Sequence, residues 1–119
     1  MAGVQKGETG GLMPITKKFS DTVATRLRES PTFCRALLRE AVGCLINGDV
    51  DTGKIVLRDY INGTIGFAEL GKALGHSPAV LIRMLEPKGN PPLRKFLEVT
   101  TYLQKMNGSI FEVVDKKAA

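Results

Sequence analysis

Residues that end or start helices recur at short intervals along this chain, and they limit the folds that it can adopt. Between them, apolar residues return every three or four positions, as Phe19, Val23 and Leu27 do, which is the period of a helix with one buried face. The interrupting pairs are Ser30-Pro31, Asn47-Gly48, Asn62-Gly63 and Asn107-Gly108. The pattern therefore predicts an all-α fold of five or so short helices.

The residues at each interruption predict where the helices begin. Ser30 and Ser77 can each accept a hydrogen bond from a free N–H of the next helix, and the Pro after each Ser suits the first helical position. Asp51 can cap the third helix in the same way. We expect helical segments over 16–29, 31–46, 51–62, 66–74, 77–85 and from 91 or 92 to about 105. Residues 109–114 are β-prone, and a short strand there would have to pair across a dimer or lie on the helices.

The length of 119 residues fits one small domain. Residues 1–15 hold glycines and a proline with little apolar content, which predicts a flexible N-terminal arm. The helical domain is expected over 16–107, followed by a strand or tail over 108–119. No stretch approaches the apolar length of a membrane span, and the N-terminus lacks the apolar core of a signal peptide. We therefore expect a cytoplasmic protein with no membrane partner.

The few reactive side chains argue against an enzyme or a metal site. Cys34 and Cys44 fall in one predicted helix about 15 Å apart, too far for a disulfide, and we interpret both as small buried apolar residues. His76 is the lone histidine and has no nearby Cys, so a zinc site cannot be assembled locally. No nucleophile, base and acid stand at a recognisable spacing. We expect no catalytic residues, no metal and no cofactor.

The segment from Gly48 to Lys54 imitates a phosphate-binding loop. Its glycines and lysine match the pattern, but Ile55 stands where Ser or Thr must hold magnesium. Asp49 and Asp51 would also put two carboxylates into a cradle meant for phosphate. We interpret the segment as an ordinary turn between helices.

Residues 66–85 have the spacing of two short helices that cross steeply. Gly71 stands where the two helices must come closest, and Gly75 permits the sharp turn before Ser77. The second helix of such a pair can enter a DNA major groove because its first residues protrude. The segment is therefore predicted to be a helix-turn-helix.

The chain from Gly66 to Leu103 resembles the helix-turn-helix domain of phage-repressor-like transcriptional regulators, especially the addiction-module antidote proteins (antitoxins). The most specific feature is Gly89-Asn90-Pro91 before a helix rich in Leu, Phe and Val. The stretches 30–41 and 53–62 are also similar to small bacterial and phage regulators, so the resemblance covers about 17–107. It implies a homodimer on double-stranded DNA and, for an antidote, a toxin protein as partner and repression of its own operon.

The resemblance implies that 77–85 is the recognition helix. Arg83 is its only long polar donor and our best candidate for a base or phosphate contact. Residues 78–80 stand where family members often carry Arg, Glu, Ser, Asn or Gln. The Pro, Ala and Val side chains present here cannot form bidentate hydrogen bonds to base edges, so direct readout of the base sequence should be poor. The DNA-binding candidates are Lys72, Ser77, Pro78, Ala79, Val80, Arg83, Lys88, Asn90, Arg94 and Lys95.

The charge agrees with this interpretation to a limited extent. The chain carries +5, and from residue 67 to residue 107 six basic residues stand against three acids, a balance of +3. The main alternative is a protein-interaction module that docks a partner with the apolar tip formed by 78–80 and Ile82. A second alternative is a helix pair that merely packs, with the basic residues as a solvated face.

Overall fold

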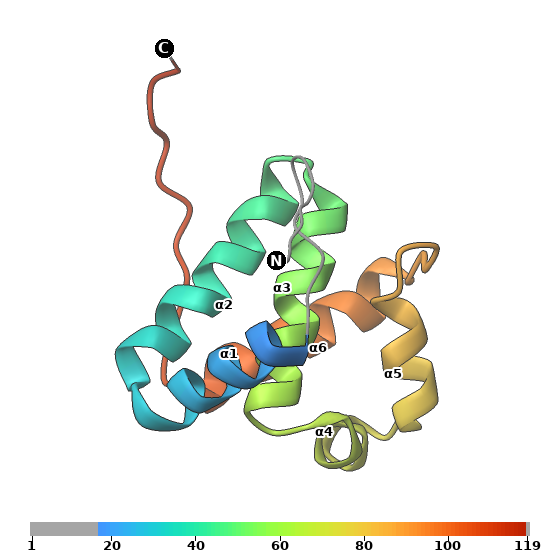
Figure 1. Ribbon diagram of the computed structural model, residues 1–119. Helices are drawn as coiled ribbons and strands as arrows, with labels where there is room; N and C mark the ends of the chain where they lie inside the picture. Colours follow the sequence, from blue (N-terminus) through green and yellow to red (C-terminus); the bar gives the residue numbers. More distant parts are fainter. Residues whose placement is uncertain (1–16, 119) are drawn as a thin grey trace.

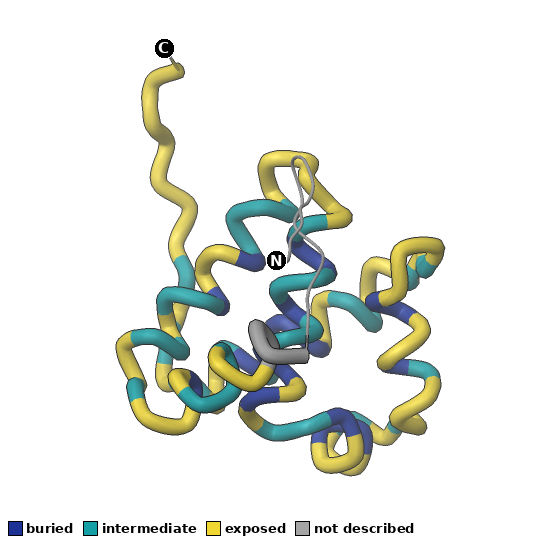
Figure 2. The backbone as a smooth tube through the Cα atoms, in the orientation of Figure 1, coloured by how far each residue is buried: buried dark blue, intermediate teal, exposed yellow. Residues whose placement is uncertain are grey.

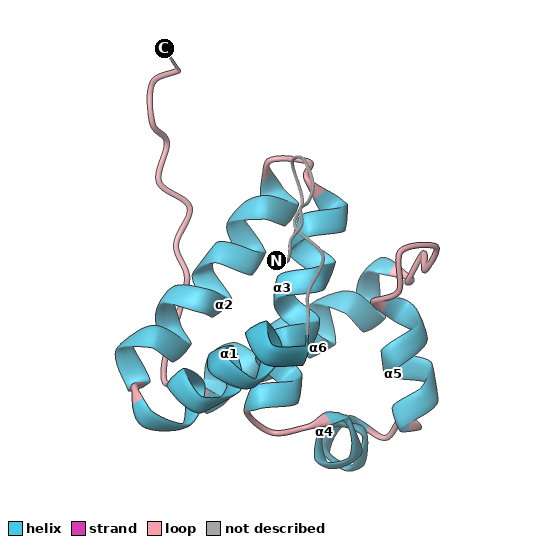
Figure 3. Cartoon of the chain, in the orientation of Figure 1, coloured by secondary structure: helices cyan, strands magenta, loops and turns pink. Residues whose placement is uncertain are grey.

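The computed structural model describes residues 17–118 and the side chains of residues 21–118; the predicted flexible arm over 1–15 lies outside the described residues. The described part contains six helices and no strand, which confirms the all-α fold (Figures 1 and 3). The helices are α1 (Lys17–Glu29), α2 (Pro31–Ile46), α3 (Val50–Gly63), α4 (Phe67–Leu74), α5 (Pro78–Met84) and α6 (Leu93–Met106).

Serine and aspartate side chains cap three of these helices. The predicted caps of α2 and α5 are confirmed, since Ser30 and Ser77 each accept a backbone N–H three residues later, at 3.0 and 3.3 Å. The predicted cap of α3 is wrong: Asp49, and not Asp51, accepts the Thr52 N–H, at 3.4 Å. Asp51 lies instead in the first turn of α3, where a negative charge is favourable because this is the positive end of the helix dipole.

The strand predicted at 109–114 is absent. Residues 109–118 are extended but form no ladder, and beyond Phe111 they lead away from the helices (Figure 1). Phe111 itself packs against the core, and its N–H donates to Gln104 Oε1 at 3.1 Å. A strand cannot form here because no second extended segment of the described chain lies beside it.

Helix α3 lies at the centre of the core. It packs against both α1 and α2, and Leu57 and Ile61 have no exposed surface at all. Helices α2, α4, α5 and α6 add one fully buried leucine each; these are Leu38, Leu70, Leu81 and Leu103. In Figure 2 the buried residues accordingly follow the inner sides of the helices. Helix α3 is thus buried on more than one side.

The loop that imitates a phosphate site is a turn followed by the start of α3. Gly48 adopts a φ of 88°, and Gly53 is buried against Leu45, whose side chain would lie 2.7 Å from a Cβ at that position. Lys54 is only 5% exposed. A buried lysine cannot reach a phosphate in solvent, so the interpretation of this segment as a turn is confirmed.

Both cysteines are free thiols and are only half-buried. Cys34 packs against the core and its Sγ lies 3.0 Å from the Leu27 carbonyl oxygen, while burial raises the pKa of its thiol. Burial and the neighbouring Glu40 carboxylate also raise the pKa of the Cys44 thiol. Both thiols are therefore protonated at neutral pH and are poor nucleophiles.

Candidate nucleic-acid interface

Helices α4 and α5 form a tight pair joined by three residues. Gly75 ends α4 in the left-handed conformation, with a φ of 74°. Figure 1 shows α4 end-on while α5 runs across the view, so the two helices cross steeply. The close approach predicted at Gly71 is confirmed, because a Cβ there would lie 2.5 Å from the His76 carbonyl oxygen. The nearest atom belongs to the turn, and the next, the Pro78 nitrogen at 3.5 Å, belongs to the first residue of α5.

One side of α5 is buried and the other faces solvent. Leu81 and Met84 enter the core, whereas residues 77–79, Ile82 and Arg83 are exposed. Val80 is half-buried and packs against the core, so it is less available than the sequence suggested. The exposed start of α5 therefore consists of a serine, a proline and an alanine, with Arg83 one turn further along.

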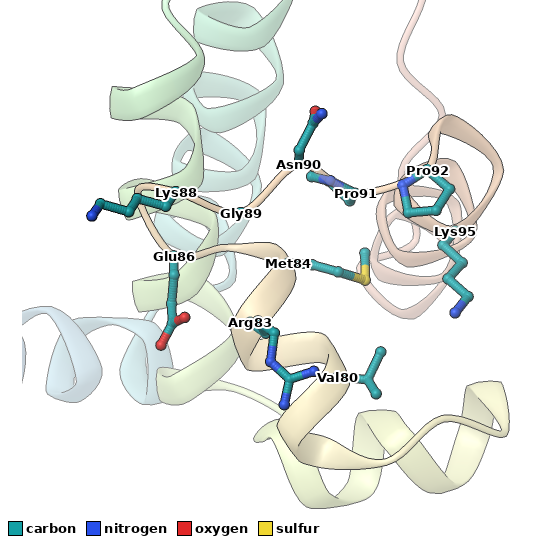
Figure 4. A pocket seen from close by; sticks show the side chains of 10 residues that line it. All are labelled: Val80, Arg83, Met84, Glu86, Lys88, Gly89, Asn90, Pro91, Pro92 and Lys95. Carbon is teal, nitrogen blue, oxygen red and sulfur yellow. The ribbon is translucent and has the colours of Figure 1, made fainter.

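A hollow of about 430 Å³ lies between α5, the following loop and the start of α6 (Figure 4). Arg83 from α5 and Lys95 from α6 lie on two sides of it, and in this view the side chains of Val80 and Met84 lie between them. The remaining lining residues are Glu86, Lys88, Gly89, Asn90, Pro91 and Pro92. The hollow thus has apolar side chains between two cationic groups, with the Glu86 carboxylate also on its lining, and the two cations suit a phosphate backbone.

The structure brings four of the seven predicted polar contacts together at this hollow and leaves Lys72, Ser77 and Arg94 apart. Those that line it are Arg83, Lys88, Asn90 and Lys95. Lys72 lies on α4 in an exposed ion pair with Glu69 at 3.2 Å, which is weak enough to leave the lysine available. Arg94 lines a different hollow on α6, beside Leu93 and Glu98.

Lys54 positions the loop that carries Lys88 and Asn90, and sequence reasoning missed this role. Its ammonium group donates to the Glu86 carbonyl oxygen at 3.3 Å and also to the Gly89 carbonyl oxygen. The available signal was periodicity, because Lys54 precedes Leu57 and Ile61 by three and seven residues and so belongs to the buried stripe of α3. A charged residue on such a stripe has to find polar partners inside the fold.

His76 connects the turn between α4 and α5 to α6. Its Nε2 lies 3.2 Å from Glu98 Oε1, and the histidine is the more buried of the two. This contact gives the histidine a structural role. Across residues 17–118 no three His, Cys, Asp or Glu side chains gather as metal ligands would.

Comparison of the chain with protein-family models, with curated proteins and with solved structures produces no match. None of the described helices is long and apolar enough to cross a membrane.

Proposed function

We propose that this protein is a DNA-binding transcriptional regulator that inserts α5 into the major groove as a homodimer. The observation that supports this most is the exposed start of α5, which projects from a tight helix pair next to the cationic hollow at Arg83 and Lys95. A short helix presented in this way fits the groove, and the flanking cations fit the phosphates on its edges.

Some of these side chains would contact DNA phosphates, and others would contact the edges of the bases. Lys88 and Lys95 neutralise phosphates, and Lys72 approaches the backbone from α4. At the start of α5, the Ala79 methyl can touch a thymine methyl, but neither it nor Pro78 can discriminate bases by hydrogen bonds. Contacts with phosphates therefore contribute most of the affinity for DNA, and the preference for particular base sequences is modest. Arg83 contributes most of that preference.

Replacing Arg83 by alanine tests the proposal. Affinity for duplex DNA selected from a random pool should fall by about 1–3 kcal/mol, about five- to 150-fold, because Arg83 is the only long donor on α5. Fluorescence anisotropy over a salt series measures both the affinity and the number of phosphates neutralised, since salt weakens binding through counterion release.

The matched control removes the same charge elsewhere. Arg39 is exposed on α2, is not part of α5 and does not line the hollow. Arg39→Ala should therefore change the affinity for DNA far less than Arg83→Ala. Equal affinities for the two variants, or no DNA binding at low salt, would refute the insertion of α5 into the groove.

A protein-interaction module is the second candidate function. It is favoured by the apolar character of the exposed α5 residues, Pro78, Ala79 and Ile82, of which Ile82 is 38% exposed. A toxin protein, as the antidote resemblance implies, is one such partner, and the protein would then repress its own operon. Ile82→Glu should abolish binding of the partner; it is a better probe than the half-buried Val80. If a purified partner binds this variant with unchanged affinity, α5 is not the docking helix.

A further inference from the structure

The C-terminal tail, residues 109–118, presents apolar side chains that nothing in the described chain covers. Ile110, Val113 and Val114 are 90%, 90% and 80% exposed. Single exposed apolar residues are ordinary, but three β-branched ones within five positions of an open, non-helical trace have the character of a strand without a partner.

The tail is held only at its beginning. Phe111 packs against the core and donates its N–H to Gln104 of α6, whereas residues 112–118 are all exposed. These residues form no hydrogen bond or ion pair with residues 17–111, and they lead away from the helices (Figures 1 and 2). The tail therefore does not lie along the helices, and its backbone groups are free to pair with another chain.

We infer that the tail pairs with the same tail of a second copy, as an antiparallel two-stranded ribbon. When a two-fold axis relates two antiparallel strands, one residue lies opposite its own copy. Because Phe111 is already bound to α6, the free strand begins at Glu112. The symmetric segment 112–116 is centred on Val114.

The charges of the tail support this register. Centring on Val114 puts Glu112 opposite Lys116 of the second copy, and the symmetry repeats this attraction. Centring on Glu112 or on Asp115 would instead put two carboxylates face to face, which is unfavourable. Centring on Val113 aligns no opposite charges. Neither Glu112 nor Lys116 has an ion-pair partner in the described chain, so both are free for this contact.

This inference rests on the homodimer of the proposed function and names the segment that builds it. A two-stranded ribbon is marginally stable by itself, so the free dimer is weak. Two half-sites on one DNA duplex then hold both copies at a high effective concentration and strengthen the pairing.

Proline substitutions test the ribbon in the full chain without DNA. Backbone N–H groups point alternately toward and away from the partner strand, so either Val113→Pro or Val114→Pro must remove a ladder hydrogen bond. Both positions lie outside the helical core, and an unchanged circular dichroism spectrum checks that the helices remain. Sedimentation equilibrium over a dilution series should show that at least one of the two weakens dimerisation tenfold or more. Ala118→Pro, outside the paired segment, is the matched control and should have little effect.

A charge exchange tests the register. Glu112→Lys and Lys116→Glu should each weaken the dimer, and the double variant should restore it because the attractive pairs are re-formed with reversed sign. No rescue would overturn the register centred on Val114.

Two outcomes would overturn the ribbon itself: a wild-type chain that is monomeric up to millimolar concentration, or a dimer that survives both proline variants. A tail that pairs only with a different protein produces the first of these. DNA binding is measured separately through Arg83. A monomer with Arg83-dependent DNA binding would contradict only the ribbon, and a tail-dependent dimer without DNA binding would contradict only the proposed regulator.

Discussion

Gly71→Ala should lower the free energy of unfolding by about 1–3 kcal/mol, the usual cost of overpacking. The new Cβ would lie 2.5 Å from the His76 carbonyl oxygen, which is closer than atoms in contact can come. That oxygen belongs to the backbone of the turn, so relief requires the turn and the start of α5 to move. Urea denaturation measures the loss. Because α5 is displaced, DNA affinity should fall as well.

The same substitution at Gly43 is the matched control. Gly43 also lies inside a helix, but a Cβ there would meet nothing within 4 Å. Gly43→Ala should therefore stabilise the protein by about 0.5–1 kcal/mol, because alanine loses less backbone entropy in a helix. A Gly71→Ala protein as stable as the wild type would mean that the two helices do not need this close approach.

Leu57→Ala should lower the free energy of unfolding by about 2–5 kcal/mol. Leu57 has no exposed surface and lies on the central helix α3, so truncation leaves a cavity that several helices would have to collapse to fill. Domains of this kind are stable by only about 5–15 kcal/mol, so this one change removes a large part of the total.

Leu97→Ala is the control for this second prediction. Leu97 is 49% exposed on α6, and its loss should change stability by about 0.5 kcal/mol or less. Chemical denaturation of both variants, with equal denaturant dependence, measures the difference. If the two truncations cost the same, α3 is not the centre of the core.

Local signals predicted the helices well. Ser30 and Ser77 cap α2 and α5 as expected, because a cap depends on a hydrogen bond between residues three apart. The wrong prediction of the α3 cap arises because Asp49 and Asp51 are both residues that can cap a helix. Which of them does so depends on where the turn at Gly48 ends and the helix begins.

The strand expected at 109–114 fails for a different reason. Its β-branched residues favour extended backbone, and in Figure 1 residues 109–118 form an open trace without helical turns. A strand also needs a neighbour, and no neighbour exists within the described chain.

The candidate interface could be predicted residue by residue but not as a surface. The sequence alone identified the cations and the helix pair, because these depend on residue type and short spacing. The sequence did not show that Arg94 and Arg83 line different hollows. It also did not show that Val80 packs against the core.

The sequence by itself determined an all-α chain, where most of its helices begin and end, and a tight turn at Gly75, since capping bonds and glycine conformations are set within a few residues. Only the tertiary structure decided which side chains meet. Lys54 holds the loop at Glu86 and Gly89, more than thirty residues away, and so places Lys88 and Asn90 at the edge of the hollow that Arg83 also lines. Such a contact depends on how distant helices pack, because burial is a property of the assembled core and not of any short segment.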